Sequence, residues 1–291
     1  MTPSDLVRLF TLGAIWGASF LFIRIASPVL GPAFLSEGRV LFAAIFLTAL
    51  AIYLKKDRQV LVHWKHFLVM GFFNSALPFF LWSYCALSLS AGQLSILNAT
   101  APAWGFLIGL LTGSERFSRK RGLGLMLGLV GVVVLFSRET DTAISGNYTD
   151  IFAGLCAAAS YGVAIHYAKR VKSLAPFQNA YGSMWAAAFL LIPVLFFMPV
   201  RGAVTISVYG SVVALGVLCT GLAYLLYFRL IQDVGATSTL TVTFLIPLFG
   251  TFLGVVFLDE VITLRTALGM VIILFGIALV TSFNLKALAK S

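Results

Sequence analysis

The sequence predicts an integral membrane protein built entirely from α-helices. Of its 291 residues, 60% are hydrophobic and 10% are charged, and the mean hydropathy is +1.01. Soluble globular domains contain about 45–50% apolar and about 25% charged residues, so this composition excludes an ordinary water-soluble fold. A helix of about 20 apolar residues crosses about 30 Å of hydrocarbon. Charge-free runs of at least that length occur at 67–114, 173–200, 202–228, 234–258 and 266–285.

Ten helices are expected along the chain. Apolar segments alternate with short stretches of proline, glycine, asparagine or clustered charge, which end helices. These boundaries place the helices at 6–27, 32–54, 66–88, 91–113, 119–137, 150–170, 176–199, 206–231, 236–257 and 264–283. Membrane β-strands alternate apolar and polar residues over segments of about 10, whereas Gly122 to Phe136 is apolar on every face. We therefore expect a helical bundle without a sizeable extramembrane domain.

Basic residues are distributed unequally between the two ends of this bundle. With the N-terminus inside, fifteen of the twenty lysines and arginines lie on the inner side, and five lie outside or in the outer half of the membrane. The positive-inside rule therefore places both termini in the cytoplasm of a bacterial-type inner membrane. The net charge of +10 reflects this topology, and we expect no nucleic-acid partner.

The sequence contains an internal repeat at an offset of 145 residues, without a gap. The aligned pairs are Pro102 with Pro247, Gly105 with Gly250, Gly109 with Gly254, Glu115 with Glu260, Gly124 with Gly269, Gly131 with Gly276, Gly17 with Gly162, Gly71 with Gly216 and Trp82 with Tyr227. We predict two five-helix repeats, 1–137 and 150–291, joined by a loop at 138–149. Because five is odd, the repeats are inverted in the membrane, which is typical of alternating-access transporters with a central solute site.

Several of these motifs together resemble a known family. They are Ile15-Trp16-Gly17, an arginine in the second expected helix at Arg39, and two Pro-x2-Gly-x3-Gly-x5-Glu segments, each followed by a glycine-spaced helix. This pattern resembles the EamA family of the drug/metabolite transporter superfamily over essentially the whole chain, and within it the YddG-type exporters of aromatic and other amino acids. The resemblance implies that helices 1 to 4 and 6 to 9 surround a central cavity, while helices 5 and 10 are peripheral.

Three prolines indicate where a polar cavity is expected. Proline lacks an N–H, so the carbonyl four residues earlier loses its helical partner. The pairs of proline and freed carbonyl are Pro78 with Asn74, Pro102 with Asn98 and Pro247 with Thr243. Unpaired backbone at membrane depth is tolerated only where protein or water satisfies it. These positions are therefore candidates for solute binding, with a simple kink satisfied by a neighbouring hydroxyl as the alternative.

Aromatic residues inside the expected helices form a second group of candidates. They are Trp16, Phe79, Trp82, Trp104, Tyr161, Trp185, Tyr224 and Tyr227. Ring faces stack on apolar side chains and hold an ammonium group by a cation–π contact of about 2 kcal/mol when desolvated. Such faces suit an amino acid, and plain core packing is the alternative for each residue.

Four glycines and one histidine complete the candidate residues. Gly105, Gly109, Gly250 and Gly254 have the Gly-x3-Gly spacing of closely packed helices, and we expect a role in packing or gating. His166 is the one histidine inside an expected span. It either carries a coupled proton or makes a structural hydrogen bond.

Charged residues are scarce within the expected spans. Helices 1, 3, 6, 7 and 10 contain no central carboxylate, which disfavours a carboxylate-coupled antiporter. Glu37 and Arg39 are expected near the outer end of the second helix, where they line a vestibule or reach the headgroups. Glu115 and Glu260 occupy equivalent turns, where capping and pairing within the loop are expected. This pattern favours a neutral or zwitterionic solute over a phosphorylated one.

No HExxH, GxSxG or GxxxxGK[ST] motif occurs in the sequence, so we expect no enzyme, no cofactor and no metal site. The sequence predicts a secondary or facilitative transporter that exports amino acids, aromatic and other neutral ones, or similar small zwitterionic metabolites. Its expected partners are this solute and membrane lipids, and a monomer is expected. The alternatives are a drug or amphipathic-cation exporter and, in another class, a lipid scramblase or membrane enzyme.

Overall fold

The computed structural model describes residues 2–56, 62–136, 148–170, 174–234, 239 and 242–280, and all regular structure in these ranges is helical. The first part of the chain contains α1 (Pro3–Tyr53), α2 (Trp64–Gly71), the π-helix η1 (Phe72–Ala76), α3 (Leu77–Cys85), α4 (Ala91–Asn98), α5 (Ala101–Leu111) and α6 (Arg119–Phe136). The second part contains α7 (Tyr148–Arg170), α8 (Pro176–Leu195), α9 (Ile206–Val213), the π-helix η2 (Ala214–Leu222), α10 (Ala223–Val234), α12 (Val242–Leu258) and α13 (Leu264–Val280). The predicted all-helical class is confirmed for the described residues.

Five helical segments among the described residues are long and apolar enough to cross a membrane. They are Pro3–Tyr53, Trp64–Cys85, Ala91–Leu111, Tyr148–Ala168 and Ile206–Tyr227. Two shorter apolar helices, Val242–Leu258 and Leu264–Leu279, follow them. These segments are compatible with a membrane protein.

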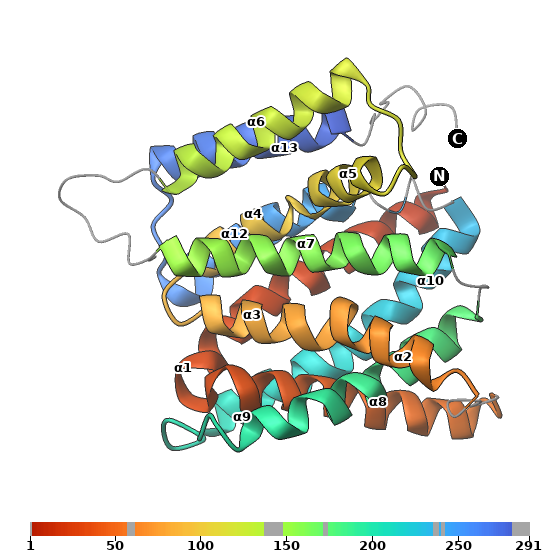
Figure 1. Ribbon diagram of the computed structural model, residues 1–291. Coiled ribbons are helices and arrows are strands. Elements are labelled where there is room, and N and C mark those ends of the chain that lie inside the picture. The colour runs from red at the N-terminus through yellow and green to blue at the C-terminus, as the bar shows by residue number, and fades with distance from the viewer. Residues whose placement is uncertain are drawn as a thin grey trace.

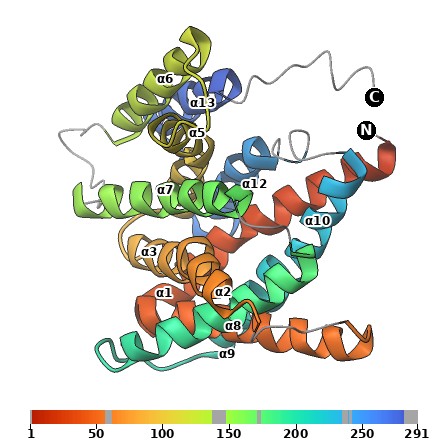
Figure 2. The same ribbon diagram turned by 45° about the vertical axis from the view of Figure 1, so that its right-hand side comes forward.

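The long helix α1 folds back on itself at Gly31. At about 1.5 Å per residue, a straight helix of 51 residues would be about 77 Å long, far more than a bilayer requires. Gly31 has φ 73° and ψ 168°, outside the helical region, and Pro28 and Pro32 flank it. Glycine adopts positive φ without a steric penalty. Figures 1 and 2 show the two parts of α1 running in different directions from this point, where the sequence predicts a helix boundary.

Other expected helices are interrupted where the sequence predicts continuous ones. The segment expected at 66–88 is divided into α2, η1 and α3, and the one at 206–231 into α9, η2 and α10. The segment expected at 91–113 breaks between Asn98 and Ala101, because Pro102 lacks the N–H that would continue the helical ladder. The ends also differ: α8 stops at Leu195 instead of 199, since Pro199 follows a short turn.

Close helix crossings occur at two places that correspond under the offset of 145 residues. Where α1 crosses α12, a Cβ atom on Gly17 would lie 3.0 Å from the backbone nitrogen of Gly250. Where α7 crosses α5, a Cβ atom on Gly162 would lie 3.0 Å from the backbone nitrogen of Gly105. Only glycine permits such backbone contact, as in other membrane helix pairs.

The helices α6 and α13 form a pair at one edge of the molecule (Figures 1 and 2). They approach closely, because a Cβ atom on Gly131 would lie 3.1 Å from the carbonyl oxygen of Gly269 and 2.9 Å from the backbone nitrogen of Ile273. The main core includes residues of both helices of this pair, and within it Trp82 packs edge-on against Phe20 at a centroid distance of 5.7 Å. The start of α1 and the end of α13 lie at the same end of the bundle (Figure 1).

Candidate functional site

Arg39 lies inside the bundle on the second part of α1. Arg39 is 7% exposed, and its Nε–H donates a 3.0 Å hydrogen bond to Thr220 Oγ1. Its guanidinium carbon is 3.7 Å from the ring centroid of Phe79. The burial of Arg39 contradicts the alternative in which its side chain reaches the headgroups. The second part of α1 packs so closely on η2 that a Cβ atom on Gly216 would lie 2.8 Å from the Arg39 carbonyl oxygen.

The charge of Arg39 has no partner of opposite sign among the described residues. No carboxylate oxygen of these residues lies within 4.0 Å of its guanidinium nitrogens. Glu37 is two residues away, a spacing at which helical side chains do not face one another. Its Oε2 atom is itself buried without a hydrogen bond. A buried charge without a counter-charge is costly, which makes Arg39 a candidate functional residue.

Polar and aromatic side chains from other helices surround Arg39. Tyr161 on α7 and Tyr224 on α10 lie near its guanidinium. Asn74 Nδ2 on η1 donates a 3.1 Å hydrogen bond to Tyr224 Oη. Asn74, Tyr161 and Tyr224 are half-buried and keep part of their surface accessible. We refer to these side chains as the Arg39 cluster, which comprises Arg39, Asn74, Phe79, Tyr161, Thr220 and Tyr224.

The two π-helices position polar side chains of this cluster. η1 carries Asn74, and η2 carries Thr220. Thr220 Oγ1 donates a 2.8 Å hydrogen bond to the Leu215 carbonyl, five residues earlier, while it accepts from Arg39. A π-helical turn widens the backbone and is frequent at functional sites. Sequence reasoning missed Thr220, since no residue pattern distinguishes a π-helical turn from an α-helical one.

A second aromatic pair lies next to the cluster. The rings of Trp16 and Tyr227 are 5.4 Å apart between centroids and tilted by 47°. Tyr227 lies near Tyr224, which is three residues earlier on the same face of α10. The structure therefore brings Phe79, Tyr161 and Tyr224 to Arg39, and the Trp16–Tyr227 pair lies beside Tyr224 on α10.

Three predicted aromatic residues lie elsewhere. Trp82 is 1% exposed and belongs to the packed core, although its indole is beside Tyr161. Trp185 is 37% exposed and donates a 3.1 Å hydrogen bond to Thr48 Oγ1 on α1. Trp104 lines an apolar crevice of about 70 Å³ between α5, α6, α7 and α13. None of the residues that line this crevice belongs to the Arg39 cluster.

The three predicted proline positions differ in their backbone. At Pro102 the helix is interrupted, and the Asn98 carbonyl accepts no backbone hydrogen bond across the break within the described residues. Pro247 lies inside the continuous helix α12, four residues after Thr243. Pro78 is buried at the start of α3, directly after η1. Asn98 keeps part of its surface accessible but makes no hydrogen bond with the Arg39 cluster among the described residues.

His166 connects α7 to α5 and to the turn that follows α5. Its Nε2 atom is 2.7 Å from the Gly105 carbonyl oxygen, and its Nδ1 atom is 3.0 Å from Ser114 Oγ. A neutral ring with its hydrogen on Nε2 satisfies both contacts, by donating to the carbonyl and accepting from the hydroxyl. Gly109 provides the room, because a Cβ atom there would lie 2.9 Å from His166 Cε1. These contacts support the structural alternative for His166.

Glu260 caps the N-terminus of a helix from the other half of the chain. Its Oε1 and Oε2 atoms accept hydrogen bonds from the backbone nitrogens of Ala91 and Gly92 on α4, at 2.6 and 3.2 Å. A carboxylate at this position also compensates the positive end of the helix dipole. Gly254 provides the space, because any Cβ atom there would collide with the Glu260 carboxylate. Glu115 instead forms a 2.9 Å ion pair with Arg121.

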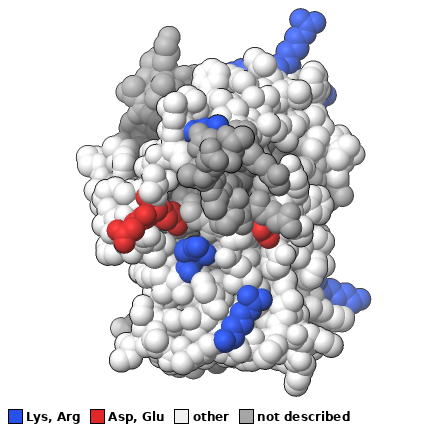
Figure 3. All heavy atoms as spheres, turned by 90° about the vertical axis from the view of Figure 1, so that its left-hand side faces the viewer, with Lys and Arg blue, Asp and Glu red and all other residues white. Residues whose placement is uncertain are grey.

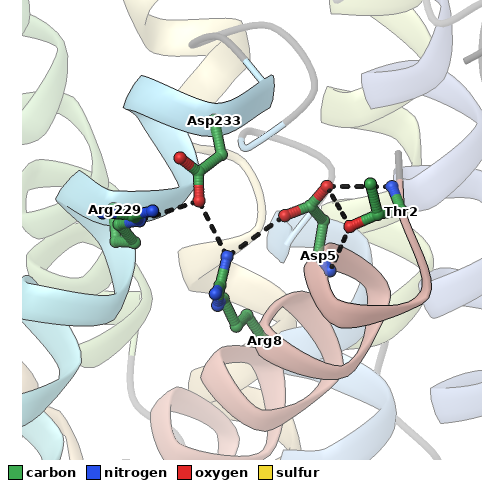
Figure 4. A network of polar contacts seen from close by, with 5 residues as sticks. All are labelled: Thr2, Asp5, Arg8, Arg229 and Asp233. Carbon is green, nitrogen blue, oxygen red and sulfur yellow. Dashed lines mark hydrogen bonds and ion pairs between the residues drawn. The ribbon is translucent and has the colours of Figure 1, made fainter.

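A network of charges joins α1 to α10 at the end of the bundle where α1 begins (Figure 4). Arg8 Nη1 is 2.7 Å from Asp233 Oδ2 and 3.2 Å from Asp5 Oδ1. Arg229 Nε is 2.8 Å from the same oxygen of Asp233. Because Arg8 and Asp233 are 225 residues apart in sequence, this network connects the two halves of the chain.

Comparison with known proteins identifies the family. The sequence model of the EamA-like transporter family matches residues 6–137 and 149–282. The chain belongs to the EamA-like transporter family. It is therefore a multi-pass membrane transporter rather than an enzyme, within the drug/metabolite transporter superfamily.

Several curated relatives match nearly the whole length of this chain. The uncharacterized transporter YoaV of Bacillus subtilis (strain 168) is 24% identical over 94% of both chains. An uncharacterized transporter of Archaeoglobus fulgidus is 26% identical over 92% of this chain and 94% of its own, and Protein PagO of Salmonella typhimurium is 25% identical over 93% and 91%. A crystal structure with 19% identity and a TM-score of 0.67 covers 100% of both chains. At this identity, the crystal structure shows the shared fold alone.

Proposed function

We propose that this transporter exports amino acids, aromatic and other neutral ones, or similar small zwitterionic metabolites, as a secondary or facilitative carrier. The observation that carries the proposal is the Arg39 cluster, in which a buried cation, an amide, hydroxyls and aromatic rings lie together inside the bundle, and several of these side chains keep accessible surface. Small-molecule sites commonly combine aromatic walls with a few polar groups that orient the ligand. The rings of Tyr161 and Tyr224 suit both an apolar side chain and an ammonium group.

The proposed architecture has ten transmembrane helices in two inverted repeats, 1–137 and 150–291, with a linking loop at 138–149. In this scheme, α1 supplies two spans that meet at Gly31. The equivalent glycine crossings of Gly17 with Gly250 and of Gly162 with Gly105 support it. So does the family match, which falls in two segments of similar length.

We propose that both termini lie in the cytoplasm and that the protein resides in a bacterial-type inner membrane. Among the described residues, the end of the bundle with the Gly31 turn shows scattered basic and acidic side chains on a mostly uncharged surface (Figure 3). The opposite end carries Lys55 and Lys56 after α1 and Arg119 at the start of α6. This difference supports the orientation given by the positive-inside rule.

Alternating access would proceed by rocking of the two repeats about the central site. Contacts between the halves occur at both ends of the bundle. Arg8 and Asp233 join them at one end, and Glu260 reaches α4 at the other. Breaking the Arg8–Asp233 contact would open the central site at one end of the bundle, and breaking the Glu260 contact would open it at the other end. The residues proposed to line the solute path are Trp16, Asn74, Pro78, Phe79, Asn98, Pro102, Tyr161, Tyr224, Tyr227, Thr243 and Pro247.

The test is transport of labelled phenylalanine by the purified protein in proteoliposomes. We expect counterflow well above that of protein-free vesicles, and a loss of at least about tenfold in the Tyr224→Ala variant, which removes a ring of the cluster. Trp185→Phe is the matched control, because Trp185 is exposed on α8, and it is expected to transport normally. The absence of movement of any amino acid by correctly folded protein would contradict the proposal. Lipid flipping or movement of amphipathic cations alone would favour the alternatives.

A further inference from the structure

We propose that Arg39 binds a carboxylate group of the transported solute, so that the transporter accepts solutes with a carboxylate and excludes the corresponding amines. The inference rests on the proposed function, in which the Arg39 cluster holds the solute, and it adds the group by which the solute is recognised. Four observations support it: the unused donors of Arg39, its missing counter-charge, its fixed orientation and its asymmetry between the two halves.

The first observation is that most hydrogen-bond donors of Arg39 are unused. A guanidinium has five N–H groups. Only the Nε–H has an acceptor among the described residues, namely Thr220 Oγ1. The two Nη atoms have no acceptor there, yet they are not among the fully buried atoms that lack a partner. The Nη edge therefore faces accessible space, and its paired N–H groups match the two oxygens of a carboxylate.

The second observation is that the cluster contains no negative charge to balance Arg39. The other members, Asn74, Phe79, Tyr161, Thr220 and Tyr224, are neutral side chains at pH 7. In a buried environment, a cation without a counter-ion is unfavourable. A carboxylate from the solute would supply the missing charge, whereas a phosphate would bring about two negative charges to a site with one cation.

The third observation is that Arg39 is held in one orientation. Phe79 lies under the guanidinium plane, with 3.7 Å between the ring centroid and the guanidinium carbon. Thr220 fixes the Nε side, and its own hydroxyl hydrogen is bound by Leu215. The group is thus pre-oriented before the solute arrives, which lowers the entropy cost of binding. The face of Phe79 is already used by Arg39, so a solute ammonium group must bind other rings.

The fourth observation is that the equivalent position in the second half is not charged. The offset of 145 residues pairs Arg39 with Met184, which is fully buried in a core cluster. A structural role common to both halves would require similar residues at the two positions. The difference fits a solute with a single anionic group, bound on the side of the first half.

The test compares ligands that share a phenyl group and differ in charge. Purified full-length protein in detergent is titrated with phenylalanine, 3-phenylpropionate, phenylalaninamide and phenethylamine, and the shift of the thermal unfolding midpoint is recorded. We expect stabilisation by phenylalanine and 3-phenylpropionate, and an affinity at least about 10-fold lower for the two ligands without a carboxylate. In Arg39→Gln, the two carboxylate ligands are expected to lose about 10- to 100-fold in affinity.

Two further variants separate recognition from folding. Arg39→Lys retains the charge but not the paired donors, so it is expected to keep part of the carboxylate preference. Trp185→Phe, which changes an exposed side chain on α8, is expected to bind like the wild type. If Arg39→Gln does not fold, the comparison of the four ligands on wild-type protein and on Arg39→Lys still decides the question.

The outcomes distinguish this inference from the proposed function. Binding of 3-phenylpropionate that depends on Arg39, without transport of any amino acid, would contradict amino-acid export and support the carboxylate site. Transport of phenylalanine together with equal affinity for phenethylamine would support export and overturn the carboxylate site. Failure of all carboxylate ligands to stabilise the folded wild-type protein would also overturn it.

Discussion

The two π-helices, one in each half of the chain, carry different side chains at equivalent positions. Residues 72–76 of η1 correspond to 217–221 under the offset of 145, and these lie inside η2. At these turns, Asn74 is paired with Cys219 and Ser75 with Thr220. Asn74 and Thr220 contribute to the Arg39 cluster through hydrogen bonds. The comparison teaches that a π-helical turn occurs at both of these equivalent positions, while the residues that differ between them supply different polar groups.

The glycine crossings show the same contrast within the packing. Gly105 and Gly250 are equivalent residues on α5 and α12, and both face a glycine on another helix. A Cβ atom on Gly250 would lie 2.6 Å from Ser95 Cβ, whereas a Cβ atom on Gly105 would have no atom within 4 Å. The sequence predicts that a side chain at either glycine would prevent close helix packing. This prediction fits Gly250 better than Gly105.

The largest expected effect tests this difference. Gly250→Ala is expected to destabilise the protein by about 1–3 kcal/mol, because the added methyl group overpacks against Ser95. Gly105→Ala is the matched control and is expected to be neutral or stabilising, since it adds helix propensity without a clash. Thermal unfolding of both variants in detergent checks the prediction. Equal destabilisation by the two substitutions would contradict it.

A medium effect is expected at the π-helices. Thr220→Val removes the acceptor of the Arg39 Nε–H, and we expect a loss of about 1–2 kcal/mol in solute binding, which is about 5- to 30-fold in KM. Ser75→Ala at the equivalent position is expected to change KM by less than about twofold, because the Ser75 hydroxyl has no hydrogen bond of good geometry. Initial rates in proteoliposomes measure both, and a Ser75→Ala effect as large as that of Thr220→Val would refute the asymmetry.

The smallest effect is expected at the end of the bundle. Glu260→Gln keeps an acceptor for the α4 backbone but loses the charge at the helix N-terminus, which stabilises by about 0.3–1 kcal/mol. The adjacent residue Asp259 is exposed, so Asp259→Asn is the matched control and is expected to have no effect on the unfolding midpoint. Thermal unfolding at low salt checks the pair, and indistinguishable midpoints for Glu260→Gln and the wild type would argue against the cap.

Much of the fold follows from patterns that the sequence displays directly. The all-helical class and the break at Gly31 follow from apolar run length and from the backbone chemistry of proline and glycine. The close crossings at Gly17 and Gly162 agree with the repeated small residues. These features are local or periodic, which is why a single sequence suffices to predict them.

The centre of the site depends on contacts between distant segments, and the sequence does not contain that information in a local pattern. The depth of Arg39 depends on how α1 turns at Gly31 and packs on η2. The position of Thr220 depends on a π-helical turn, and the reach of Glu260 to α4 depends on a contact across 169 residues. In contrast, Asn74, Tyr161 and Tyr224 were predictable, because buried polar and aromatic residues are uncommon within apolar spans.

The central claim is that Arg39 holds the solute. The most direct measurement is the transport rate of Arg39→Met, which gives position 39 the same residue as the equivalent position 184. At phenylalanine concentrations below KM, we predict a rate at least about 10-fold below that of the wild type. Arg39→Lys should fall between the two, and protein content and thermal stability should be matched. Wild-type rates in a folded Arg39→Met protein would contradict the account.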